Sequence, residues 1–132
     1  CAEDSFVGKD PGELFVVQNV VLDGLMDPLV YDTIIDDVLS SQGGTPVAML
    51  TQFMTDWFAE TKKWSDATVK IAAAESAENK QVLAQWLTEW RDRAASALLP
   101  VARIALGDRT DTVMADVVQQ FNARMAKAGV AI

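Results

Sequence analysis

The stretch LFVVQNVVLDGLMDPLVYD, residues 14–32, predicts a helix whose first part is apolar on almost every side. Residues 14–17 and 20–22 are all apolar, which leaves only Gln18, Asn19 and Asp23 to face water. A surface helix keeps a polar face, so this pattern is typical of a helix that is enclosed all round. We interpret the three polar residues either as its exposed edge or as buried contacts to a partner.

Helix signals lie at both ends of the apolar run. Asp10-Pro11-Gly12-Glu13 supplies an N-cap, a proline in the first turn and a glutamate three residues after the cap, which together predict a helix start. Asp27-Pro28 repeats the cap and the proline. We therefore expect a break near Met26, followed by a second helix that ends at Gly43-Gly44.

Two long helices and a shorter one follow. The helical pattern runs from Thr45-Pro46 to about Ser76, which is itself a suitable cap for the next helix, so an antiparallel hairpin is expected. Its register should place Trp64 level with Trp86 and Trp90. Pro100 predicts a kink near Ser96, and a last helix should follow GDRTDT and stop at Gly129. The expected apolar stripes of the three helices are Leu50, Phe53, Met54, Trp57, Trp64, Thr68 and Ile71; Leu83, Trp86, Leu87, Trp90, Ala94, Ala97, Val101 and Ile104; and Met114, Val117, Val118, Phe121 and Met125.

These patterns predict an all-α chain of about five helices with a long antiparallel hairpin. Its 132 residues fit one helical domain, residues 1–132, and half of them are apolar, which suffices for a sizeable core. The chain begins on Cys1 and not on Met, which indicates a cut, processed or longer protein.

Long helical hairpins often carry carboxylate-bridged di-iron sites, whose ligands include Glu-x-x-His motifs. This chain has no histidine and one cysteine, so that ligand set, a histidine base and Cys/His zinc sites are excluded. An all-carboxylate site from Asp32, Asp36 and Asp37, or from Glu75 and Glu78, stays open, although solvated helix faces and caps explain these residues better. We expect no catalytic, cofactor-binding or metal-binding residue in this chain.

Charge limits the partners. Lys and Arg total 11 against 19 Asp and Glu, a formal charge of −8, which argues against nucleic acid and anionic membrane surfaces. Asp23, Asp27 and Pro28 interrupt the most apolar region, so we expect no membrane span. A single cysteine excludes an internal disulfide and favours a reducing, cytoplasmic location.

Three stretches, ELFVVQNVVLDGLMDPLVYD, WFAETKKWSDATVK and AAESAENKQVLAQWLTEW, resemble the β subunit of bacterial multicomponent monooxygenase hydroxylases of the phenol hydroxylase and toluene monooxygenase type. The resemblance runs from about Ala2 to Phe121 and falls on the C-terminal portion of a longer subunit. It implies part of a ferritin-like long-helix bundle without metal ligands. It also implies a paired assembly with a γ chain and with an α chain that carries a di-iron centre and activates O₂. A reductase and a small regulatory protein complete such a system.

The resemblance therefore implies a non-catalytic structural subunit that scaffolds the di-iron α subunit, which hydroxylates aromatic hydrocarbons. Phe15, Val16, Val20 and Trp57 are predicted to contact a partner, because one small bundle should not cover the whole first helix. One alternative is a stand-alone helical binding module, or a processed lipoprotein, with an apolar pocket; a signal peptide encoded before Cys1 would favour the lipoprotein. Another is an independent enzyme with the all-carboxylate site, which would require metal in the purified chain.

Overall fold

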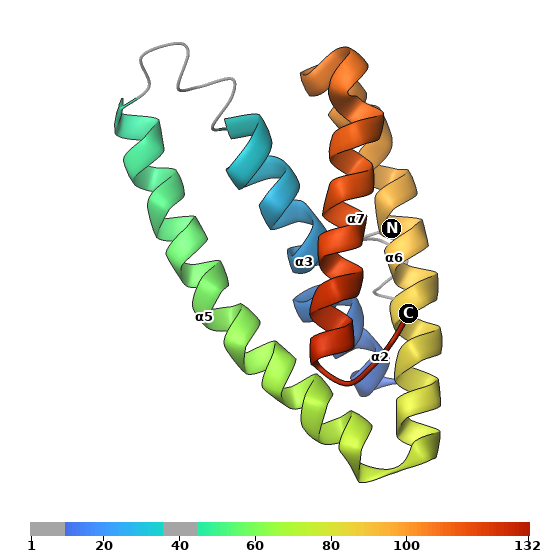
Figure 1. Ribbon diagram of the computed structural model, residues 1–132. Coiled ribbons are helices and arrows are strands. Elements are labelled where there is room, and N and C mark those ends of the chain that lie inside the picture. Colours follow the sequence, from blue (N-terminus) through green and yellow to red (C-terminus); the bar gives the residue numbers. More distant parts are fainter. Residues whose placement is uncertain (1–9, 36–44) are drawn as a thin grey trace.

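The computed structural model describes residues 10–35 and 45–132, which are helical almost throughout and contain no strand (Figure 1). The all-α class is thus confirmed for this part of the chain. We call Pro11–Ile35 the central helix. It consists of α2 (Pro11–Phe15), the π-helical η1 (Val16–Leu22), α3 (Asp23–Met26) and the π-helical η2 (Asp27–Ile35). It is followed by α5 (Thr45–Glu75), α6 (Ala77–Leu106), the 3₁₀ turn η3 (Gly107–Arg109) and α7 (Thr110–Lys127).

The central helix begins where the sequence predicts. Asp10 Oδ1 accepts hydrogen bonds from the backbone N–H groups of Gly12, at 2.7 Å, and Glu13, at 3.4 Å. These two donors have no partner within the helix, so the aspartate cap supplies one and defines the first turn.

The expected break at Asp27-Pro28 is wrong. Asp27 has helical backbone angles, φ −61° and ψ −55°, and the helix continues to Ile35. Pro28 lies in the first turn of the π-helical stretch η2. A π-helical turn is wider than an α-helical one and shifts the hydrogen-bond register, so the chain accommodates the missing proline N–H without leaving the helix. The predicted end at Gly43-Gly44 lies outside the described residues.

The central helix forms the core of the molecule. α5 and α6 lie on either side of it and α7 packs in front (Figure 1). Its fully buried side chains are Val16, Val17, Val20, Val21, Leu25 and Leu29. Three helices of the same chain therefore cover much of the helix, but Leu14, Phe15 and Leu22 stay partly exposed and Met26 is 43% exposed, so the expectation that other chains cover part of it stays a prediction.

By length and composition alone, the central helix would also qualify as a membrane span. Core helices of soluble proteins share this property. In the central helix, 44% of the most apolar 18-residue stretch is buried inside the molecule. Burial against α5, α6 and α7 accounts for its composition.

α5 and α6 form the predicted hairpin. Ser76 is extended between them, and its hydroxyl accepts a 3.0 Å hydrogen bond from the N–H of Asn79. The two helices diverge from this turn, and the central helix occupies the space between them (Figure 1). α6 continues through Pro100 to Leu106, so the proline does not end the helix and the kink stays a prediction. After α7, Gly129 adopts a φ of 92°, as its predicted role as helix stop requires.

The predicted inward stripes hold for α7 and for the first half of α6, but not for α5. Beyond Ala94 the buried face of α6 passes through Ala102, whereas Val101 and Ile104 are exposed. The buried residues of α5 are Ser65, Val69 and Ala73, whose small side chains allow close helix packing. The bulky α5 stripe faces outward; its exposed members are Phe53, Met54, Trp57, Trp64 and Ile71.

Three tryptophans of the hairpin meet α2. The Trp64 ring contacts Phe15 edge to face, with ring centroids 5.3 Å apart. Trp90 Nε1 donates a 2.9 Å hydrogen bond to Glu13 Oε1, and the Trp86 ring lies beside Gly12. The three tryptophans thus lie at the level of α2, in agreement with the predicted register, and no ring contact among them occurs within the described residues.

Candidate functional site: a buried arginine and an exposed aromatic face

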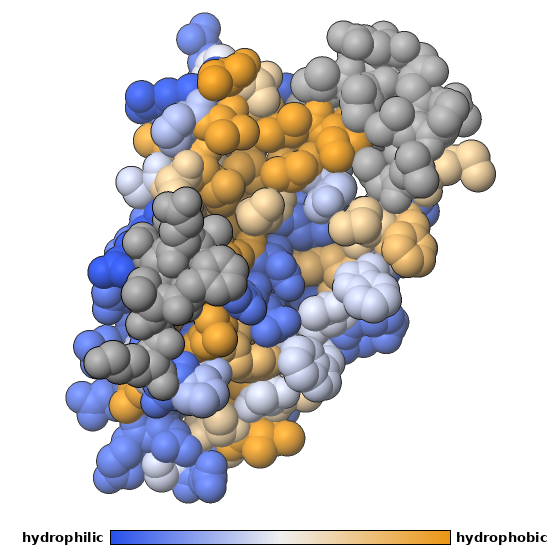
Figure 2. Space-filling view, turned by 180° about the vertical axis from the view of Figure 1, so that it is seen from behind, coloured by the Kyte–Doolittle hydropathy of each residue, from blue (hydrophilic) through white to orange (hydrophobic). Residues whose placement is uncertain are grey.

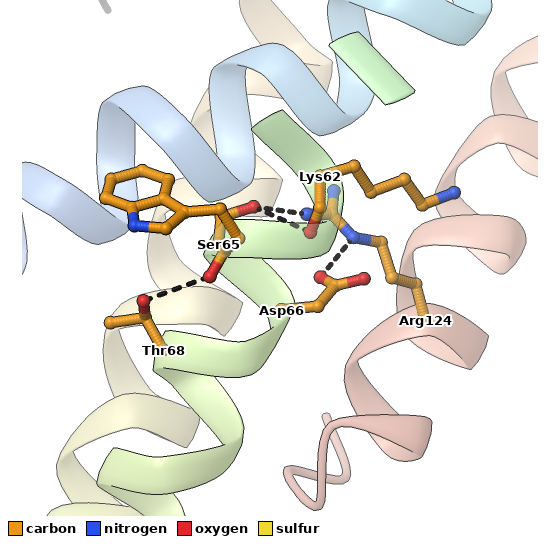
Figure 3. Close-up of polar contacts among 6 residues, drawn as sticks. Lys62, Ser65, Asp66, Thr68 and Arg124 are labelled. Atoms are coloured by element: carbon orange, nitrogen blue, oxygen red, sulfur yellow. Dashed lines mark hydrogen bonds and ion pairs between the residues drawn. The ribbon is translucent and has the colours of Figure 1, made fainter. Parts of the chain in front are cut away.

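Arg124 extends from α7 to α5, where it makes two polar contacts (Figure 3). Its Nε donates to Asp66 Oδ1 at 2.6 Å, and its Nη2 donates to Ser65 Oγ at 3.0 Å. The residue is only 9% exposed. A buried guanidinium is costly without partners, so these contacts hold α5 and α7 at a defined separation.

Gly24 of the central helix makes room for this arginine. A Cβ atom at position 24 would lie 2.7 Å from Arg124 Nη1 and 3.1 Å from two carbons of the Phe121 ring. Glycine is thus needed here for the close approach of α7. Arg124 Nη1 is buried and has no hydrogen-bond partner among the described residues.

Two carboxylates of the central helix lie near this cluster. Burial raises the pKa of Asp23, while the positive charge of Arg124 acts in the opposite direction. Burial and the neighbouring carboxylates of Asp32 and Asp23 raise the pKa of Asp27 to about 6, against the lowering effect of Lys62. Asp23 is half-buried, as are Gln18 and Asn19, so these polar residues form a partly covered edge of the helix.

Asp27 should make stability depend on pH. Its folded-state pKa of about 6 lies above the ordinary 3.8, so the folded protein binds the proton more tightly and loses stability as pH rises between these values. Asp27→Asn should therefore raise the free energy of unfolding by about 1 to 2 kcal/mol at pH 7.5. At pH 4 the same substitution should change the free energy of unfolding little. Urea titrations at both pH values test this, with the exposed Asp56→Asn as control, and a gain of equal size at both pH values would contradict it.

α5 presents an exposed apolar surface that we call the aromatic face: Met49, Phe53, Met54, Trp57 and Trp64. Trp57 and Phe53 are each 65% exposed, and their ring centroids lie 6.4 Å apart. Seen from behind, apolar side chains gather mainly in the upper part of the molecule, and hydrophilic side chains separate them from smaller apolar groups below (Figure 2). Large exposed aromatic side chains in a group indicate an interaction surface.

The predicted partner-contact residues divide into two groups. Val16 and Val20 are buried by the chain's own helices, so the prediction that they contact a partner is wrong. Phe15 is half-buried against Trp64. Trp57 is open to solvent, so its role as a contact stays a prediction.

Sequence reasoning missed Arg124 and Gly24. The available indication was a charged residue within the apolar stripe of α7, three residues after Phe121 and directly before Met125. A charge in that position must find a partner inside the fold. Nothing in the sequence identified Ser65 and Asp66 as that partner.

No cluster of three or more His, Cys, Asp or Glu side chains suited to a metal ion occurs within residues 10–35 and 45–132. Asp32 and Glu78 are exposed, and Glu75 accepts a hydrogen bond from Asn79. Asp36 and Asp37 lie outside the described residues. The described part of the chain therefore does not assemble the all-carboxylate site.

Comparison with known proteins finds matches over nearly the whole chain. Residues 1–76 match the family model described as Methane/Phenol/Alkene Hydroxylase. The chain is 44% identical over 127 residues to the phenol 2-monooxygenase oxygenase component DmpL of Pseudomonas sp. (strain CF600), which covers 96% of this chain and 37% of that protein. It is also 44% identical over 104 residues to the oxygenase component MhpL of Acinetobacter pittii (strain PHEA-2), with 79% and 31% covered.

A solved structure agrees with these matches. The xenon-pressurized phenol hydroxylase from Pseudomonas sp. OX1 superimposes with a TM-score of 0.88 and 38% identity, over 98% of this chain and 38% of that one. The chain thus spans about a third of the length of the curated relatives that it matches.

Proposed function

Because the chain belongs to the methane, phenol and alkene hydroxylase family, as the sequence resemblance implied, we propose that it is part of a non-catalytic structural β subunit of a multicomponent aromatic monooxygenase. In this proposal it scaffolds a di-iron α subunit that hydroxylates phenol- or toluene-type substrates with O₂. A γ subunit completes a paired cytoplasmic αβγ assembly, and a reductase and a regulatory protein serve it. The named relatives are oxygenase components of phenol 2-monooxygenases, which supports this choice.

The aromatic face of α5 carries the proposal. The chain's own helices bury the core side chains of the central helix, yet Phe53, Trp57 and Trp64 lie exposed along α5. Burying a large apolar side chain stabilises an assembly by about 1.5 to 3 kcal/mol, so leaving several exposed is costly unless another chain covers them. Trp and Met are also enriched at protein interfaces.

A di-iron centre does not fit the described residues. The whole chain lacks histidine, and the described part contains no suitable carboxylate cluster. In the proposal the iron therefore belongs to another chain, and this chain contributes binding and positioning only.

Trp57→Asp should weaken assembly without unfolding the chain. The substituted carboxylate would be buried and unpaired in the interface, and a loss of about 2 kcal/mol or more corresponds to at least roughly thirtyfold weaker binding. Co-expression of the complete subunit with the other hydroxylase chains, followed by affinity purification and mass measurement, tests this. The control is Ala59→Asp, an exposed position on another side of α5. Assembly of the Trp57 variant at wild-type strength would contradict the proposal.

One observation favours the binding-module alternative. A cavity of about 670 Å³ lies between α2, α5 and α6, and its apolar lining includes Phe15, Val69, Leu83 and Trp86. This volume is within the range of small-molecule sites. Saturable binding of a small apolar fluorescent probe by the isolated chain, lost when Leu83 is replaced by a larger residue, would favour this function.

A further inference from the structure

A groove of about 460 Å³ between α5 and α7 concentrates positive charge on this acidic protein. Lys62 and Lys70 line it from α5, and Lys127 and the buried Arg124 line it from α7. Among the described residues, Asp66 is the one carboxylate in its lining. We call this the cationic groove.

The charges of the groove are only partly neutralised within the described chain, where Lys62 acts electrostatically on the Asp27 carboxylate. Asp66 is bound to Arg124, and among the described residues none of the three lysines forms an ion pair. Two other basic side chains on α5 and α6 do pair with carboxylates: Lys63 with Glu60 at 2.6 Å and Arg93 with Glu89 at 2.9 Å. Several like charges around one groove raise the local positive potential, which favours an anionic partner.

The shape of the groove suits a segment of polypeptide. Its lining includes Ala67, Ala123 and Ala128, whose small side chains let another backbone approach closely. Lys62 and Lys70 are eight residues apart on one helix, which is about 12 Å or two turns and exceeds the size of a single phosphate or carboxylate. Figure 3 shows the Lys62 side chain extending toward α7, beside Arg124.

The cationic groove is separate from the aromatic face. Lys62 follows Trp57 by five residues, which places it about 140° further around α5. The two surfaces therefore present different sides of the same helix.

We propose that the cationic groove docks an acidic helix of another chain of the hydroxylase, whose carboxylates pair with Lys62, Lys70 and Lys127. Complementary charge is the reason for an acidic partner, and the two-turn span of the lysines is the reason for a helix. This inference rests on the proposed function, because it requires a second chain, but it assigns a contact surface that the aromatic face does not include.

Zero-length carbodiimide cross-linking of the intact complex tests the proposal, because the reagent joins a lysine amine directly to a carboxylate in contact with it. Mass spectrometry should find the groove lysines joined to Asp or Glu of another subunit. The exposed Lys80 on α6 should give no such product. Links only within this subunit or between two copies of it, or no links in a complex that has assembled, would overturn the groove proposal alone. Failure of any larger assembly to form would overturn it together with the proposed function.

A charge variant provides a second measurement on the same complex. The triple variant Lys62→Gln, Lys70→Gln and Lys127→Gln should abolish the links and raise the dissociation constant of the complex at least tenfold in low salt. High salt should reduce this difference because it screens the ion pairs of the wild type. The double variant Lys63→Gln and Lys80→Gln is the matched control and should assemble normally. Equal affinity of the triple variant and the wild type in low salt would refute the docking role.

Discussion

Replacing Arg124 with methionine should lower the free energy of unfolding by about 2 to 4 kcal/mol. Methionine retains an apolar stem of similar length but cannot reach Asp66 and Ser65 with polar atoms. Asp66 would then lose its 2.6 Å partner while its side chain is 31% exposed. The remaining hydration of that carboxylate keeps the loss below the roughly 5 kcal/mol that breaking a fully buried pair can cost.

The stability loss that urea titration measures for the Arg124 variant should be compared with the loss for a variant of an exposed ion pair. Arg93→Met removes the partner of Glu89 on α6, where both side chains are about half exposed, and should cost at most about 1 kcal/mol. The double variant with Arg124→Met and Asp66→Asn should lose much less free energy of unfolding than the sum of the losses of the two single variants, because both substitutions remove the same contact. Equal costs for the Arg124 and Arg93 variants would show that burial of the ion pair does not matter.

Val20→Asp should abolish cooperative folding. Val20 is 0% exposed and lies at the centre of the helix that α5, α6 and α7 enclose. An unpaired carboxylate there should cost about 4 kcal/mol or more, a large part of the total stability of a domain this size. Far-ultraviolet circular dichroism during thermal unfolding measures the loss.

Two further variants serve as controls. One separates the effect of the buried charge from the effect of lost side-chain volume, and the other separates a core position from an exposed one. Val20→Ala removes side-chain volume without adding charge and should cost only about 2 kcal/mol. Trp57→Asp should melt close to the wild type, because Trp57 is exposed on the isolated chain. A Val20→Asp chain that folds normally but fails to assemble would restore Val20 as an interface residue and contradict the arrangement described above.

Local interactions explain which helix limits could be predicted. Asp10, Ser76 and Gly129 act within one turn of their own positions, through a side-chain cap or a backbone angle that neighbouring residues do not alter. Pro28 shows the limit of such rules. Its missing N–H disfavours an α-helix, but apolar residues on both sides are buried in one core, and a π-helical stretch keeps them there.

Among the site residues, too, local patterns predicted some features and tertiary packing decided the others. Helical periodicity predicted that α5 has a bulky apolar stripe, but the same helix also carries the smaller stripe of Ser65, Val69 and Ala73. Periodicity does not decide which of the two stripes packs inward. The central helix approaches α5 closely, so the stripe of small side chains packs against it. Trp57 is left outside for that reason, and Val20 is inside.

The sequence by itself determined the all-α class, the caps, the hairpin turn, the family resemblance and the absence of histidine chemistry, because each depends on residue type or on neighbours along the chain. Only the tertiary structure decided that much of the central helix is covered by its own chain, that Arg124 reaches Asp66, and that lysines from α5 and α7 face one groove. Asp66 and Arg124 are 58 residues apart, and no local pattern encodes a contact over that distance. Such contacts arise from how whole helices pack, since a side chain's partner depends on the direction and separation of the helix opposite.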